Sequence, residues 1–421
     1  MSLAHGRPYL AIPGPSVVPD RVLTAMHRAS ANIYEGALHE MVAGIWPDLK
    51  RLACTDQHVA LYIGNGHAGW EAANTNTLRR GERALVLTTG HFGQGWAASM
   101  QGLGIDVQVL DFGRHAPVDL ARLEDTLRAD RAHAIRAVAL TQVDTATSAR
   151  NDVAGVRKVL DALGHPALLM ADCIASLGCD VFRMDDWGVD VTIAASQKGL
   201  MMPPGLVFVW FSERARQARR RTGQPAERGD DLVTPWWDWE PRAFGEAFWQ
   251  RFCGTAPTQA LHGLREALDM ILHEEGLEAV WARHAVLARA VWAAADAWGA
   301  DGGAMRLNMA DPGARAHAVT ALRLDSPDGT RLRRWCEDQA GVTLGIGLGM
   351  AEPGEYASDA WFRLAHMGHV NAHMVLGSLG VMQAGMVALG IAHGAGGVDA
   401  AARVMAEGTG ASVQPLAAAG E

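Results

Sequence analysis

A lysine, an aspartate and a glycine-rich turn stand at positions in this sequence where side chains can do chemistry. Lys198 follows the apolar run VTIAA and precedes GLMMPPG, in a chain that takes most of its positive charge from arginine. Burial disfavours the charged form of a lysine, and a lysine with a lowered pKa suits Schiff-base chemistry. A lysine that extends its ammonium group from a strand end into water explains the pattern equally well. Lys198 alone leaves both interpretations open.

The turn lies in GNGHAGWEAA, residues 64–73, and has the spacing G-x-G-x-x-G. It follows the apolar run HVALYI and begins a helical pattern, and such a turn binds phosphate through free backbone N–H groups and the helix dipole. A nicotinamide site also needs an acidic residue at the end of the second strand. Glu82 lies before that strand instead. The turn therefore predicts a phosphate site of another kind, and a purely structural turn stays open for this stretch alone.

Asp172 ends the apolar run in LLMADCIASLG. An aspartate there can hold the N–H of a pyridinium ring and keep that ring protonated. The chain thus supplies a phosphate turn, an aspartate and a lysine in that order, each at the end of a predicted strand. No metal site is expected, because His369 and His373, one helical turn apart, lack the glutamate of H-E-x-x-H.

The elements that must position these residues follow an alternating pattern. Between residues 57 and 211, short apolar runs predict strands in HVALYI, RALVLT, DVQVLD, IRAVALTQ, PALLMA, DVTIAA and LVFVWF. Helical patterns lie between them at 91–103, 117–129 and 152–163, and later at 256–299, 328–339 and 370–390. Strands that alternate with helices indicate an α/β fold with a mostly parallel sheet, whose ligands bind beyond the carboxyl ends of the strands.

We expect an N-terminal arm at 1–22, a large domain at 23–285, a small C-terminal α+β domain at 286–408 and a tail at 409–421. The charge-free segment 374–392 is about long enough to span a membrane. It contains a glutamine, a serine and four glycines, so we interpret it as a helix with one buried face, and we predict no membrane association.

The composition narrows the function classes. A formal net charge of −9 over 421 residues argues against a general nucleic-acid binder, but excludes no small anionic ligand. Five sparse cysteines predict reduced thiols. The N-terminus lacks the pattern of a signal peptide. We therefore expect a cytoplasmic protein.

Seven segments together resemble a known family: PGPS, GNGHAGWEAA, GHFGQGW, DCIASLG, SQKGLMMPPG, GTAP and FRLAHMGH. In this order, and over nearly the whole chain, they are similar to the class V aminotransferases of fold-type I, in the alanine–glyoxylate and serine–glyoxylate branch. The resemblance implies a large domain with a mostly parallel sheet flanked by helices, a small α+β domain, pyridoxal 5′-phosphate (PLP) as cofactor, and a homodimer with active sites at its interface.

The resemblance also implies roles for particular residues. The implied catalytic residues are Lys198, which bonds to PLP and moves protons, and Asp172, which holds the pyridine nitrogen. The implied cofactor-binding residues are Asn65, Gly66, His67, Phe92, Thr145, Asp172, Ile174, Gln197, Lys198 and Thr255. Phe92 would stack on the ring, and Thr255 would reach the phosphate across the dimer interface. The implied substrate-binding residues are Arg363, which would bind the α-carboxylate, with Pro13, Gly14 and Tyr34.

Departures from the family pattern bear on specificity. Phe252 stands where relatives often have a tyrosine, Ser148 replaces a glycine after TAT, and the segment NIYEGALHEM at 32–41 replaces a loop near the active site. An acidic Glu35 near the pocket would disfavour a donor with a second carboxylate.

The implied function is transfer of an amino group from serine or alanine to glyoxylate or pyruvate by a ping-pong mechanism. Three alternatives stay open. A cysteine desulfurase-like lyase would use Cys336 as nucleophile, a nicotinamide-linked oxidoreductase would use the glycine-rich turn, and a PLP-binding protein would show no turnover.

Overall fold

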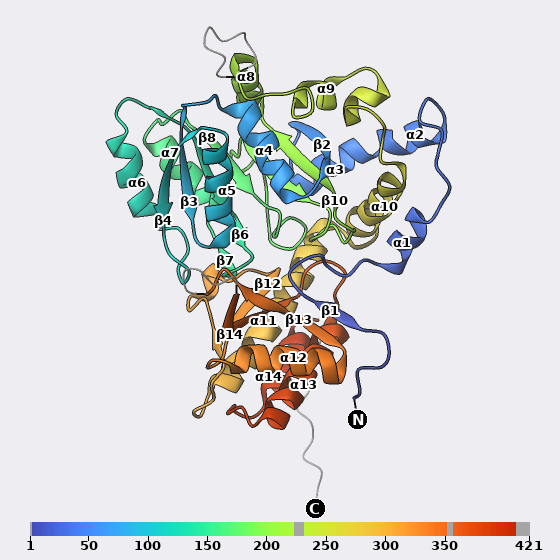
Figure 1. The fold of residues 1–421 in the computed structure, drawn as a ribbon, viewed down its shortest axis with the longest axis vertical. Helices are drawn as coiled ribbons and strands as arrows, with labels where there is room; N and C mark the ends of the chain where they lie inside the picture. Colours follow the sequence, from blue (N-terminus) through green and yellow to red (C-terminus); the bar gives the residue numbers. More distant parts are fainter. Residues whose placement is uncertain (1, 223–230, 352–356, 410–421) are drawn as a thin grey trace, which may run out of the picture.

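A computed structural model of the chain describes residues 2–222, 231–351 and 357–409 (Figure 1). The predicted tail at 409–421 lies, apart from Thr409, outside the described residues. The larger part of the molecule surrounds a seven-stranded sheet. Its strands, in spatial order, are β2 (His58–Gly64), β10 (Gly205–Phe211), β9 (Val191–Ala195), β8 (Leu168–Asp172), β5 (Ile135–Thr141), β3 (Arg83–Thr88) and β4 (Asp106–Asp111). These are the seven strands that the apolar runs predict.

The sheet is parallel except for β10, which runs antiparallel to both of its neighbours. Successive residues alternate between its two faces, as the pleat requires. Val86 of β3 therefore packs on one face, and Leu85 and Leu87 pack on the other. The predicted mostly parallel sheet is confirmed.

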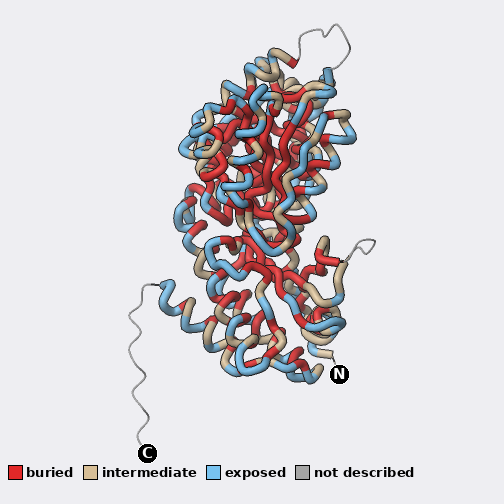
Figure 2. Tube along the Cα trace, turned by 90° about the vertical axis from the view of Figure 1, so that its left-hand side faces the viewer, coloured by how far each residue is buried: buried red, intermediate tan, exposed pale blue. Residues whose placement is uncertain are grey.

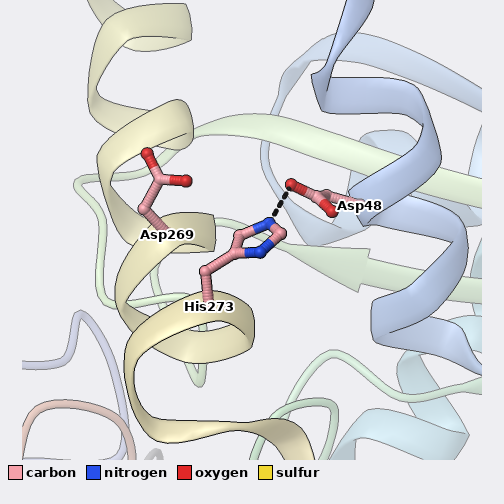
Figure 3. Close-up of side chains that lie close together, drawn as sticks. All are labelled: Asp48, Asp269 and His273. Atoms are coloured by element: carbon pink, nitrogen blue, oxygen red, sulfur yellow. Dashed lines mark hydrogen bonds and ion pairs between the residues drawn. The ribbon is translucent and has the colours of Figure 1, made fainter.

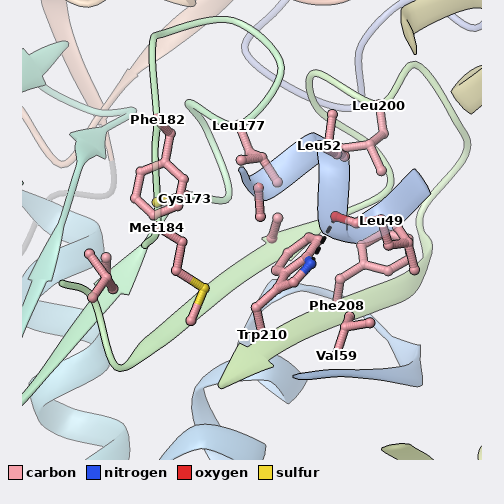
Figure 4. Close-up of a cluster of buried hydrophobic side chains, with 14 of the residues drawn as sticks. Leu49, Leu52, Val59, Cys173, Leu177, Phe182, Met184, Leu200, Phe208 and Trp210 are labelled. Carbon is pink, nitrogen blue, oxygen red and sulfur yellow. Dashed lines mark hydrogen bonds between the residues drawn. The ribbon is translucent and has the colours of Figure 1, made fainter. Parts of the chain in front are cut away.

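Helices cover both faces of this sheet. One face packs against α4 (Gly66–Thr77), α5 (His91–Gly102) and α8 (Glu213–Thr222). The other face packs against α3 (Ile45–Ala53), α6 (Leu120–Ala129), α7 (Val153–Ala162) and α10 (Thr258–Leu268). On this second face Trp210 of β10 is buried, and its indole N–H donates to the carbonyl of Leu49 at 2.9 Å, which fixes α3 on the sheet (Figure 4).

A second sheet forms the other part of the molecule (Figure 1), and both parts have buried residues at their centres (Figure 2). Its strands, in spatial order, are β1 (Tyr9–Ala11), β13 (Val342–Leu348), β14 (Ala357–Ala365), β12 (Val319–Arg323) and β11 (Arg306–Leu307). It packs against α11 (Leu277–Gly299), α12 (Asp328–Ala340), α13 (Ala372–Leu389) and α14 (Gly397–Gly408). The N-terminal strand β1 pairs in parallel with β13, so the arm of the chain belongs structurally to this sheet.

The two cores share α11. Val280 and Trp281 belong to the core of the first sheet, whereas Val291 and Trp298 belong to the core of the second. The expected domain boundary at 285 falls between these two pairs of residues. The limits of the four expected segments stay predictions. The carboxyl edge of the first sheet faces the second sheet, where the Asn308 amide donates to the carbonyl of Thr147 at 2.7 Å.

The remaining elements are short: α1 (Asp20–Met26), α2 (Ala37–Ala43), β6 (Val143–Asp144), β7 (Ala149–Arg150), α9 (Trp239–Phe244), 3₁₀ helices at Phe248–Phe252 and Pro312–Ala314, and a π-helix at Asp269–Glu275. The expected helical stretch 256–299 is therefore three pieces. It breaks at Gly276, whose φ of 88° lies outside the helical range and suits a residue without Cβ.

By length and composition α13 could cross a membrane. A third of its 18 residues are buried inside the protein. Its buried residues, Val375, Leu379, Met382 and Met386, recur at helical spacing and join the second core. This is the buried face that the sequence predicts, and the absence of membrane association stays a prediction.

One acidic group, among the described residues, has the spacing of a metal site. Oxygens of Asp48 and Asp269 and a ring nitrogen of His273 lie within 4.8 Å of one another (Figure 3). The Arg265 guanidinium already contacts both carboxylates, at 2.5 Å from Asp48 and 2.8 Å from Asp269. Because the Arg265 guanidinium supplies the positive charge, this cluster ties α3 to α10 and the π-helix with no need of a metal ion.

We expect Arg265→Ala to lower the free energy of unfolding by about 1–3 kcal/mol, because the largely buried Asp48 loses a charged partner. Arg51, which also contacts Asp48 but is half exposed, provides the control, and Arg51→Ala should cost less than about 1 kcal/mol. Urea denaturation measures both. A rise in the melting temperature of the unmodified protein on adding Zn²⁺ would contradict this assignment of the cluster.

Candidate active site

The predicted catalytic residues lie at the carboxyl edge of the first sheet. Asn65 follows β2, Phe92 follows β3, Thr145 follows β5, Asp172 ends β8 and Lys198 follows β9. Parallel strands bring their carboxyl ends to one edge. Residues spread over more than 130 positions of sequence are therefore neighbours, because five turns open on the same side of the sheet.

Lys198 lies in the turn after β9 and is enclosed by the N-terminal arm. Its amine donates to the carbonyl of Pro13. A Cβ on Gly14, whose φ is 101°, would come within 2.6 Å of Lys198 Cδ, so the arm can approach the lysine only as glycine. The Ser16 hydroxyl donates to the Lys198 carbonyl at 2.7 Å and holds the turn from the same side.

The environment of Lys198 favours its neutral form. Burial, and then the positive charge of Arg363, lower the pKa of Lys198 to about 8, and the negative charge of Asp172 opposes this only in part. With a pKa of about 8, about 10% of the amine is unprotonated at pH 7, far more than for an ordinary lysine, and the neutral amine is the nucleophile and base that Schiff-base chemistry requires.

Asp172 is buried at the end of β8, and both of its carboxylate oxygens accept hydrogen bonds. Oδ1 accepts from the backbone N–H of Ile174 and Oδ2 from the indole N–H of Trp70, each at 2.8 Å. Burial raises the pKa of Asp172 to about 6, although these two bonds lower it. The carboxylate is thus positioned by donors that favour its ionised form.

The glycine-rich turn forms the N-terminus of α4. The Asn65 side chain caps the helix by accepting from the backbone N–H of His67 at 3.2 Å. A Cβ on Gly66 would lie 2.6 Å from Ile174 Cδ1, and a Cβ on Gly69 would lie 2.9 Å from Val207. The glycines therefore let α4 lie against both the Asp172 turn and the sheet. The first turn of a helix leaves its N–H groups without helical partners, which suits an anion.

The N-terminus of α5 is already occupied by a carboxylate. Asp144 is fully buried and accepts from the backbone N–H groups of Phe92, at 2.8 Å, and Gly93, at 3.2 Å. Phe92 packs beside the core that contains Trp70. The sequence analysis missed Asp144, because a cap 52 residues from the helix that it serves leaves no local pattern.

Arg363 comes from β14 of the second sheet and is buried. Its guanidinium donates to the carbonyl of Ile346 at 2.7 Å and to that of Thr145 at 3.2 Å. The Pro13 ring lies beside Gly345, on the strand that pairs with Arg363. A Cβ on Gly345 would come within 2.7 Å of this ring. The second sheet thus places both Arg363 and the N-terminal arm at the carboxyl edge of the first sheet.

Two predicted residues do not join this group. Tyr34 is 85% exposed on the loop between α1 and α2, and Thr255 is exposed on the loop before α10. Gln197, in contrast, is next to Lys198, and its side-chain oxygen is buried with no hydrogen-bond partner among the described residues. A partnerless buried amide is a group that a ligand could satisfy.

A family model for aminotransferase class-V matches residues 8–355. The chain belongs to the class V aminotransferases. A serine–glyoxylate aminotransferase of Methylorubrum extorquens is 35% identical over 96% of this chain and 97% of that protein. An L-aspartate–glyoxylate aminotransferase of Paracoccus denitrificans is 34% identical over 97% of this chain and 98% of that protein.

The fold agrees with this membership. The crystal structure of pyridoxamine–pyruvate aminotransferase from Mesorhizobium loti superposes with a TM-score of 0.84 at 24% identity, over 96% of this chain and 98% of that one. The chain is therefore a class V aminotransferase with the fold-type I architecture, as its motifs predict.

Class V aminotransferases depend on PLP, and the residues at the carboxyl edge fit that cofactor. The N-terminus of α4 offers N–H groups for a phosphate, Asp172 offers an ionised carboxylate for a ring N–H, and Lys198 offers a neutral amine. A side chain at Gly66 would fill the space beside Ile174. The anion site, the carboxylate and the amine thus match the phosphate, the ring nitrogen and the aldehyde of PLP.

We expect Lys198→Ala to lower transamination by about 10³-fold or more, since the amine both bonds and moves a proton. The fold should persist, because the substitution removes a charge that burial disfavours. Lys158→Ala, at an exposed position on α7, is the control. Turnover and melting temperature are measured for both, and activity near the unmodified rate in Lys198→Ala would refute the assignment.

A pH series tests the lowered pKa of Lys198. With a pKa of about 8 the neutral amine rises from about 10% at pH 7 to about 90% at pH 9. PLP uptake by cofactor-free protein should therefore accelerate about tenfold over this range and level off above it. The reaction of PLP with free Nα-acetyl-lysine, whose side-chain amine has an ordinary pKa, should keep accelerating beyond pH 9. The same behaviour in the protein would contradict the lowered pKa of Lys198.

Proposed function

We propose that this enzyme transfers the amino group of a small L-amino acid, serine or alanine, to a small 2-oxo acid, glyoxylate or pyruvate, by a ping-pong mechanism. The observation that carries the proposal is Arg363, which is held by two backbone carbonyls and lies near enough to Lys198 to lower its pKa. A guanidinium binds one carboxylate in a fixed orientation. The serine–glyoxylate relative supports both the donor and the acceptor.

In this proposal each residue has one task. Bound PLP supplies an electron sink for the α-carbon of the substrate. Lys198 accepts the α-proton of the donor and delivers it to the cofactor instead of the α-carbon, Arg363 orients the α-carboxylate, and Asp172 keeps the ring nitrogen protonated. The N-terminus of α4, with Asn65, Gly66 and His67, holds the phosphate. Gln197 also contacts the phosphate, Phe92 and Ile174 lie on the two faces of the ring, and Thr145 lies beside its phenolic oxygen.

Aspartate is the competing donor, because the L-aspartate–glyoxylate relative is nearly as similar. Among the described residues, Arg363 is the one cation whose charge lowers the pKa of Lys198, and a second carboxylate would need a second cation. Glu35 is exposed on the loop that also carries Tyr34. If a partner subunit brings that loop to the pocket, Glu35 would repel an acidic donor.

The donor test is an absorption spectrum of the PLP-loaded enzyme, repeated with L-serine, L-alanine and L-aspartate. We expect the yellow band to bleach with serine or alanine at least about tenfold faster than with aspartate, which corresponds to about 1.4 kcal/mol. Glu35→Gln should accelerate aspartate alone. Faster bleaching by aspartate in the unmodified enzyme would overturn the donor assignment.

A lyase function that uses Cys336 is not favoured. This thiol is fully buried within α12, and burial raises its pKa to about 12. A thiol that stays protonated is a poor nucleophile.

We also propose a homodimer in the cytoplasm. Thr255, Tyr34 and the 60% exposed Trp249 lie on the surface of the protomer, where a second copy could cover them. All five cysteines are free thiols, which fits a reducing compartment. Light scattering should give about twice the mass of one chain, and Thr255→Val should weaken PLP binding. A monomer with unchanged PLP affinity would refute the shared site.

A further inference from the structure

Trp70 is a residue of the glycine-rich motif that the functions assigned above do not use. It is 1% exposed, lies on the second turn of α4, and donates its indole N–H to Asp172 Oδ2 at 2.8 Å across 102 residues of sequence. A buried indole N–H needs a partner. Here the partner is the carboxylate on which the cofactor nitrogen depends.

The indole ring is held on several sides. The Trp96 ring stacks on it with a centroid distance of 6.2 Å and an interplanar angle of 10°. The His67 ring meets it edge-on at 4.5 Å. A Cβ on Gly95 would lie 3.4 Å from the indole, an ordinary contact distance, so α5 passes close to the ring on that side. A donor clamped in this way can fix the orientation of its acceptor.

Asp172 has two donors within the protein, and they differ in kind. The backbone N–H of Ile174 belongs to the same turn and moves with the carboxylate. Trp70 belongs to α4, whose N-terminus carries the phosphate turn. We propose that Trp70 is a positioning residue that sets the geometry and ionisation of Asp172, so that α4 fixes the phosphate end and the nitrogen end of the cofactor together.

This role has a consequence for pH dependence. Charge-assisted bonds from Trp70 and Ile174 lower the pKa of Asp172, as does the positive charge of Lys198, whereas burial and the charge of Asp144 raise it. Removing the indole N–H takes away a bond to the ionised form. The pKa of Asp172 must then rise, and protonation of this carboxyl breaks its contact with a ring N–H.

The test compares two matched variants of the PLP-loaded full-length enzyme. Trp70→Phe removes the donor to Asp172, and Trp210→Phe removes a similarly buried indole on the other face of the sheet, whose N–H donates to the Leu49 carbonyl at 2.9 Å instead. We expect Trp70→Phe to move the acid limb of the kcat profile up by about one pH unit, to lower kcat by about tenfold, and to weaken PLP binding. Trp210→Phe should leave the acid limb in place.

A double-mutant cycle separates positioning from simple loss of packing. In an Asp172→Asn background, Trp70→Phe should have little further effect on PLP affinity, because the carboxylate through which Trp70 acts is gone. Equal shifts of the acid limb in Trp70→Phe and Trp210→Phe, or an unmoved acid limb in Trp70→Phe, would overturn the proposal.

A measurement on the unmodified chain keeps the proposal testable if Trp70→Phe does not fold. In cofactor-free protein labelled with ¹⁵N-tryptophan, one of the fourteen indole N–H resonances should titrate with the Asp172 carboxyl near pH 6. The same resonance should lose this titration in Asp172→Asn. If no indole resonance follows that carboxyl, Trp70 does not control Asp172, whereas the aminotransferase activity is unaffected by this result.

Discussion

The structure depends on placing an acid and an amine, Asp172 and Lys198, where water has little access. Burial alone would neutralise both, since it raises the pKa of the acid and lowers that of the amine. Two N–H donors oppose the effect of burial on Asp172, so that its pKa is about 6 and the carboxyl is ionised at neutral pH. The Lys198 amine donates to the carbonyl of Pro13. The fold around them serves mainly to hold these few polar contacts in an otherwise apolar place.

Two separate cores supply that setting. The first sheet provides the turns that carry Asp172 and Lys198, and its alternating faces are each sealed by helices. The second sheet provides Arg363 and, through the pairing of β1 with β13, places Pro13 and Gly14 over the lysine. The site is therefore complete only when both cores are docked, because the N-terminal arm pairs with the second sheet and contacts the lysine of the first.

α4 has a special place in this arrangement because it touches three parts of the site. Its N-terminus is the phosphate turn, its glycines allow contact with Ile174 and the sheet, and Trp70 bonds Asp172. A site built on a rigid helix holds its geometry more tightly than one built on loops. Asp144 has the complementary effect at α5, where it fills the N-terminus and leaves α4 as the free anion site of the pair.

The sequence by itself determined the strands of the first sheet, the turn at 64–69, the candidate roles of Asp172 and Lys198, and the family, because periodicity, glycine spacing and motif order are local properties of the chain. Only the tertiary structure decided the Trp70–Asp172 bond, the Asp144 cap and the pairing of β1 with β13. Tyr34 and Thr255 lie outside the group that one chain assembles. The physical reason is that hydrogen bonds across 50 to 100 residues arise when separate elements dock, and docking leaves no repeat in the sequence.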